Sequence, residues 1–183
     1  MRYAGPLTPK QAAAFWTLSA LNGDDLRRLA FQWLEEGLES DGVNILVGET
    51  DVTLRDHGRL FERCLTELGV SIESKRHAAW MLAQTLLRSV EAGGDPLDAT
   101  YDILAMLHYP GFVLFAPRNC APDGKAYAGE ELGIEHMLGL YYTLDEYGLF
   151  KAESRRFMEE LRVECLRVLA EFYTTPPTDL LDA

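Results

Sequence analysis

The chain lacks the cysteine pattern of a disulfide-bonded or zinc-binding protein. Its 183 residues include Cys64, Cys120 and Cys165, with no close pair and no CxxC. An odd number of well-separated cysteines is not a disulfide framework, and no Cys/His quartet is present to hold structural zinc. Cys64 and Cys165 fall on apolar positions of predicted helices, where a thiol behaves as a small hydrophobe. We therefore expect a protein of a reducing compartment.

Basic residues are scarce relative to acidic ones. Lys and Arg number 17 against 29 Asp and Glu, which gives a formal net charge of −12. Nucleic acid is not an expected partner, because phosphate binding needs clustered Lys and Arg. The same charge would attract a basic protein surface.

Long apolar runs are also missing. No run reaches the roughly 18 residues of a membrane span, so no membrane partner is expected. Residues 12–21, after Lys10, are apolar over the length of a signal-peptide core, but Pro6 and Pro9 interrupt the start and no A-x-A site follows. Thr8-Pro9 instead matches a helix N-cap followed by proline at the first helical position. We expect a cytoplasmic protein.

Motifs that would identify an enzyme are absent. The chain contains no phosphate loop, no dinucleotide-binding fingerprint and no G-x-S-x-G. None of the four histidines, His57, His77, His108 and His136, belongs to H-x-x-x-H or E-x-x-H. Glu73 and His77 are four residues apart, a spacing far more typical of a surface contact than of a ligand pair. The sequence therefore predicts no catalytic residues, no metal and no cofactor.

The spacing of apolar residues predicts an all-α fold. Seven helices are expected, and residues 43–48, an apolar run with no partner strand, are expected to be a loop tucked against the core. We predict a single-domain bundle over residues 1–173, one long irregular loop at about 109–129 and a flexible, acidic C-terminal tail at 174–183. The seven helices are predicted at about 9–21, 24–40, 53–68, 74–92, 95–108, 130–147 and 157–172.

Helical spacing also predicts which side chains face inward. On the first helix, Asn22-Gly23 is expected to act as a stop signal, and Asp24 is expected to cap the second helix. On the helix at 95–108, the expected inner positions are Leu97, Tyr101, Leu104 and His108. On the helix at 130–147, they are Ile134, Met137, Leu138 and Tyr141.

The negative charge is concentrated in the middle of the chain. Residues 1–88 and 151–183 each have a net charge of −2, whereas residues 89–150 carry two basic against ten acidic side chains, a net of −8. Asp95, Asp98 and Asp102 follow three-four spacing and share a helix face. One interpretation is a solvated face that maintains solubility. The other is a docking surface for a basic partner.

Aromatic residues accumulate in the same region, and tyrosine is enriched at the centres of interfaces. We therefore predict a protein-binding protein that presents an acidic, aromatic-rich face to a basic partner protein. The predicted contact residues are Asp95, Asp98, Asp102, Tyr109, Glu130, Glu131, Glu135, Tyr142, Asp145 and Glu146.

Two other functions stay open at this point. A small hydrolase or transferase would use Cys120, which lies in the long loop after Arg118, with His108 or His136 as base, or a His–carboxylate pair. A structural, oligomer-forming helical protein would leave a large apolar helix face exposed after folding. The sequence does not determine the oligomeric state or the role of the 109–129 loop.

Three segments resemble small, acidic, all-helical bacterial proteins. They are residues 34–40 (LEEGLES), 61–69 (FERCLTELG) and 95–104 (DPLDATYDIL), and the resemblance extends over about residues 25–172. Most proteins of that group are of unknown function, and some look like immunity proteins encoded beside toxin genes. The shared motifs are helix-boundary patterns and bring no catalytic residues. The resemblance implies a cytoplasmic antidote or accessory protein with a partner such as a toxin.

Overall fold

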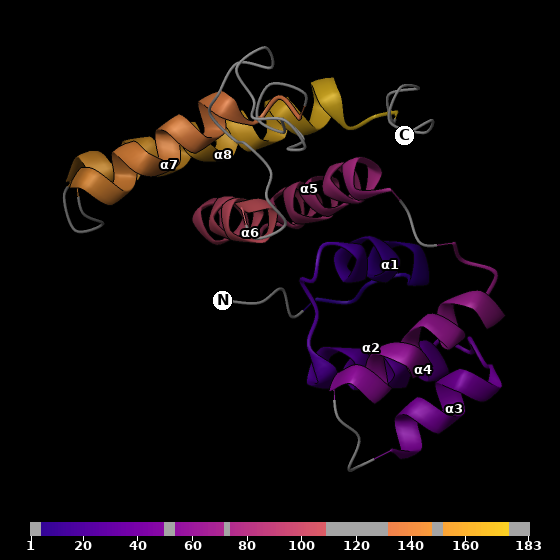
Figure 1. Ribbon diagram of the computed structural model, residues 1–183. Coiled ribbons are helices and arrows are strands. Elements are labelled where there is room, and N and C mark those ends of the chain that lie inside the picture. Colours follow the sequence, from indigo (N-terminus) through magenta and orange to yellow (C-terminus); the bar gives the residue numbers. More distant parts are fainter. Residues whose placement is uncertain (1–4, 50–53, 72–73, 109–131, 148–151, 176–183) are drawn as a thin grey trace. The chain divides into compact units, whose positions relative to one another are not determined.

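The computed structural model describes residues 5–49, 54–71, 74–108, 132–147 and 152–175. Within these ranges the chain forms eight helices and no strand, which confirms the all-α class (Figure 1). The helices are α1 (Pro9–Thr17), α2 (Gly23–Glu35), α3 (Asp41–Gly48), α4 (Leu54–Glu67), α5 (Lys75–Glu91), α6 (Pro96–His108), α7 (Glu135–Tyr147) and α8 (Ala152–Phe172).

The chain divides into two compact units, residues 2–78 and residues 79–183. The first contains α1 to α4 and the start of α5, and the second contains the rest of α5 with α6 to α8. The predicted single domain over residues 1–173 stays a prediction. The predicted loop at 109–129 and most of the predicted tail lie outside the described residues.

In the unit of residues 2–78, helices α2, α3 and α4 pack on one another (Figure 1). Trp33 of α2 is fully buried and stacks on Phe61 of α4, with ring centroids 5.6 Å apart. Its indole N–H donates to the carbonyl of Leu7 at 2.8 Å, so the one polar atom of this ring is satisfied. Trp16 of α1 meets the same phenylalanine edge to face. Aromatic packing thus links three helices of this unit.

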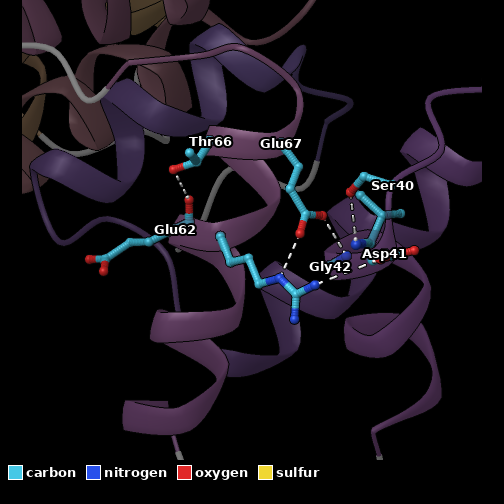
Figure 2. Close-up of polar contacts among 8 residues, drawn as sticks. Ser40, Asp41, Gly42, Glu62, Thr66 and Glu67 are labelled. Atoms are coloured by element: carbon cyan, nitrogen blue, oxygen red, sulfur yellow. Dashed lines mark hydrogen bonds and ion pairs between the residues drawn. The ribbon is translucent and has the colours of Figure 1, made fainter.

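Residues 43–48 form most of α3, so the predicted loop is wrong. Ser40 caps this helix, with its hydroxyl oxygen accepting the N–H of Val43 at 3.2 Å. Glu67, at the end of α4, accepts the N–H of Gly42 at 2.7 Å (Figure 2). This hydrogen bond is the main reason why the pKa of the Glu67 carboxyl is lowered, and the ion pair with Arg63 lowers the pKa further. A short helix rich in Val, Ile and Gly has weak intrinsic stability, so a cap from 25 residues away supports it.

The boundary between α1 and α2 also differs from the prediction. Helix α1 ends at Thr17, where Ser19 takes a left-handed conformation and the N–H of Ala20 bonds to the carbonyl of Phe15. This closure is usually made by glycine, so serine concealed the helix end in the sequence. Asn22 then acts as the N-cap of α2 and exchanges hydrogen bonds with Asp25, a capping box. The predicted stop at Asn22 and cap at Asp24 are therefore wrong.

In the unit of residues 79–183, α7 and α8 run side by side (Figure 1). Tyr173, just after α8, is fully buried and stacks on Trp80 of α5. Its hydroxyl donates to the carbonyl of Leu132 at 3.0 Å, and the Trp80 indole N–H donates to the carbonyl of Phe172. These contacts hold α5, the turn that precedes α7 and the end of α8 together.

Candidate partner-binding surface

The structure places the three predicted aspartates of α6 in two environments. Asp95 and Asp98 are exposed, whereas Asp102 is buried, with an exposed fraction of 7%. Asp95 caps the helix, since its carboxylate accepts the N–H of Leu97 at 2.8 Å. Only the first two acids are therefore available on the surface of this helix.

The burial of Asp102 follows from a rotation of α6 relative to the predicted inner face. The buried apolar residues are Ala99, Ile103, Met106 and Leu107, whereas Tyr101 is 42% exposed. The predicted inner position of Tyr101 is therefore wrong, whereas Leu97 and Leu104 are half-buried. The side chain of the fourth predicted residue, His108, lies outside the described residues. This helix is apolar around most of its circumference, so more than one stripe satisfies helical spacing.

Tyr101, now on the surface, meets two tyrosines of α7. Its ring centroid lies 6.4 Å from that of Tyr141, which in turn lies 5.6 Å from that of Tyr142. Tyr101 and Tyr142 are 42% and 41% exposed, and Tyr141 is half-buried. Three aromatic rings from two helices thus form one continuous group with two rings open to solvent.

Acidic side chains flank this tyrosine group along both helices. Asp98 precedes Tyr101 by three residues on α6, and Glu135 precedes Tyr142 by seven on α7, so each acid shares a helix face with a tyrosine. Both acids are exposed. Gly139 lies between Glu135 and Tyr142 and has open space at its Cβ position. We call Asp98, Tyr101, Glu135, Tyr141 and Tyr142 the acidic–tyrosine surface.

Asp102 contributes a buried carboxyl next to this surface. Burial is the main cause that raises its pKa to about 6, and the charge of Asp98, one turn earlier, makes a smaller contribution to that rise. Its Oδ1 has no hydrogen-bond partner among the residues that the structure describes. Near neutral pH, ionisation of this buried carboxyl therefore lowers the stability of the folded state.

A histidine–carboxylate pair lies at the contact of α7 with α8. His136 Nδ1 is 3.1 Å from Oε1 of the buried Glu164, and Arg167 holds both oxygens of that carboxylate. Hydrogen bonds from Arg167, and then from His136, lower the pKa of Glu164. The imidazole itself is largely exposed. His136 was a predicted candidate base, but sequence spacing did not identify Glu164 as its partner, because the two residues are 28 positions apart on different helices.

Several predicted site residues lie outside the part of the chain that the structure describes. Tyr109, Glu130, Glu131 and the loop thiol Cys120 lie outside the described residues. Asp145 and Glu146 belong to α7 by their backbone, and their side chains lie outside the description as well. Conversely, Tyr101 and Tyr141 were expected to point inward and were not among the predicted contact residues. The available signals were the three-residue spacing of Tyr101 from Asp98 and the position of Tyr141 next to Tyr142.

The two cysteines that the structure describes belong to the core. Cys64 and Cys165 are buried, as predicted, and burial raises the pKa of each thiol to about 11, which makes them poor nucleophiles. Across the described ranges, no three His, Cys, Asp or Glu side chains are grouped to hold a metal ion. In the same ranges, no helix combines the length and apolar character needed to cross a bilayer.

Comparisons with known proteins found no match: no protein-family model fits the chain, and no curated protein or solved structure is significantly similar to it.

Proposed function

We propose that this chain binds a basic partner protein through the acidic–tyrosine surface of residues 79–183. The observation that carries the proposal is the group of three tyrosines from α6 and α7, two of them more than 40% exposed beside Asp98. Aromatic side chains that lie together and are partly exposed often mark protein interfaces, where tyrosine is enriched.

The chemistry of this surface suits Lys and Arg side chains. A cation over a tyrosine ring gains roughly 0.5–2 kcal/mol, depending on how far it is desolvated. Asp98 and Glu135 would add charge-assisted hydrogen bonds at the rim. Residues 79–183 carry eight basic and seventeen acidic side chains, a net of −9, which would speed the approach of a basic protein.

The protein would act by occlusion, as an immunity-type or inhibitor-like protein. Tyrosines would anchor the partner, while the acids would occupy the basic groups that the partner, such as a toxin, uses on its own substrate. The resemblance to acidic bacterial proteins supports this role and a cytoplasmic location. It implies no cofactor and no catalytic residue.

The proposal is tested by capturing partners with tagged protein from a lysate of the organism that encodes it, at 0.05–0.1 M and about 0.5 M salt. Three baits are compared: wild type, Tyr101→Ala with Tyr142→Ala, and Asp98→Lys with Glu135→Lys. We expect one dominant basic protein on the wild-type bait only, released at the higher salt. Equal capture by all three baits would contradict the proposed surface.

A matched control separates the local effect from the change in net charge. Glu35→Lys with Glu39→Lys makes the same charge change on exposed acids of residues 2–78. This bait should keep the partner. Circular dichroism of all four proteins should show the same helix content, so that a lost partner reports a lost contact.

The His136–Glu164 pair supports a second candidate, an enzyme that uses this imidazole as a general base. Buried Glu164 would orient the ring, as a carboxylate does in many catalytic pairs. This candidate predicts that His136→Ala abolishes a hydrolase or transferase activity and leaves partner capture intact. Capture lost together with the activity would instead place His136 in the binding surface.

A further inference from the structure

A pocket of about 290 Å³ lies between the start of α6 and the first half of α8. Its volume is at the lower end of the range for small-molecule sites, so it suits a small ligand better than a nucleotide. Asp95 and Pro96 line it from α6. From α8 the lining residues are Ser154, Arg155, Met158, Glu159 and Arg162.

The charges of this pocket are of both signs and are not paired with one another. Within the described residues, Arg155 and Glu159 make no ion pair, although they stand four residues apart on α8. The neighbouring Arg156 and Glu160 have the same spacing and do form an ion pair, at 2.8 Å. Spacing therefore permits the pair, and the pocket side of the helix leaves a cation and an anion free for a ligand.

The other two charged residues are held in place by the backbone. Arg162 donates to the carbonyl of Val90 at 3.2 Å and to that of Gly94 at 3.0 Å, which fixes its guanidinium at the end of α5. The Asp95 carboxylate is fixed by the N–H of Leu97. The pocket thus has two anchored charges of opposite sign, and two charged side chains, Arg155 and Glu159, that are exposed and not paired with each other.

We infer that this pocket binds a small zwitterion of the α-amino acid type. Its carboxylate would pair with Arg155 and the remaining donors of Arg162, and its ammonium group with Glu159 and Asp95. A ligand of one charge sign would gain from two of these residues and be repelled by the other two, whereas a zwitterion is attracted by all four. Met158 and Pro96 supply an apolar wall for an aliphatic side chain.

The test uses the full chain and three matched probes, followed by isothermal titration and by amide shifts in NMR. The probes are L-leucine, 4-methylpentanoate, which lacks the amine, and 3-methylbutylamine, which lacks the carboxylate. We expect saturable binding of L-leucine at about 1 mM or tighter, and binding about tenfold or more weaker for each analogue. The shifted amides should belong to residues near 95 and 154–162.

Variants decide whether the pocket is responsible. Arg155→Gln and Glu159→Gln should each weaken L-leucine about tenfold or more, because each removes one charge-assisted contact. Arg156→Gln, on the same helix with its charge already paired, is the control and should bind as wild type. The proposal is overturned if L-leucine does not bind, if either analogue binds as tightly, or if the control loses as much affinity as the pocket variants.

Discussion

The protonation of the buried Asp102 carboxyl affects the stability of the fold. Its folded-state pKa of about 6 lies above the ordinary value of 3.8, because burial penalises the charged form. Between these pH values the folded state holds more protons than the unfolded state. The free energy of unfolding therefore falls as pH rises through this window and stays lower above it.

At the residue scale we predict that Asp102→Asn stabilises the protein above pH 7. The neutral amide removes the cost of a buried charge, a gain of roughly 1–3 kcal/mol, whereas below about pH 4 the variant and wild type should be similar. Urea unfolding at pH 4 and pH 8 measures the difference. The exposed neighbour Asp98→Asn is the control and should change little. A variant that is less stable than wild type at pH 8 would show that the carboxylate has a cation partner.

Two glycines in the middle of helices show how packing decides the effect of one chemical change. Gly58 of α4 is buried, and a Cβ there would lie 2.8 Å from the Trp16 ring of α1. Gly139 of α7 is exposed, and its Cβ position is open. Both would gain helix propensity from alanine, about 1 kcal/mol each, but only the first would meet a clash.

At the element scale we therefore expect opposite results for the same substitution. Gly139→Ala should stabilise the protein by about 0.5–1 kcal/mol. Gly58→Ala should destabilise it, because a clash of this kind typically costs about 1–3 kcal/mol and Trp16 is packed against Phe61. Thermal unfolding followed by circular dichroism gives both signs. A stabilising Gly58→Ala would mean that the Trp16 ring moves aside without cost.

Across the whole molecule, negative charge is distributed unevenly between the two units. Residues 2–78 carry nine basic and twelve acidic side chains, a net of −3, against −9 for residues 79–183. A flexible, positively charged peptide that forms no specific interface should therefore be attracted mainly to residues 79–183. The preference should vanish in about 0.5 M salt, since the screening length is then only a few ångströms.

A ten-lysine peptide tests this prediction at the scale of the molecule. In an NMR titration at low salt, amide shifts should concentrate in residues 79–183 and disappear when salt is raised. A Gly-Ser peptide of the same length should produce none. Shifts spread evenly over both units would show that the surfaces of the two units attract the peptide equally, despite the uneven charge of the sequence.

Local signals allowed most of the fold to be predicted. Thr8-Pro9 begins α1 as expected. Gly69 takes a left-handed conformation just after the predicted end of α4 at residue 68, and Asp95 caps α6 where that helix was predicted to begin. These features depend on hydrogen bonds between residues a few positions apart, which a sequence displays directly. The apolar stripe Ala79, Leu82, Leu86 and Val90 of α5 is buried for a similarly local reason, its regular spacing.

The candidate site was less predictable, because it depends on which face of each helix is covered. Asp98 and Tyr142 were found from charge and composition, but Tyr101 was expected in the core and Asp102 on the surface. Both errors have one origin, the rotation of α6 that buries Ile103 and Leu107. When a helix is apolar on most sides, the helices packed against it determine which side is buried.

By itself, the sequence determined the helical class, most helix starts and stops, and the location of the negative charge along the chain. Only the tertiary structure decided that residues 41–48 form a helix, that three tyrosines meet between α6 and α7, and that Glu164 supports His136. Caps and periodicity are properties of neighbouring residues, whereas each of these three features needs atoms brought together from distant positions. For α3 the distant group is the Glu67 carboxylate, which accepts the N–H of Gly42 from 25 residues away.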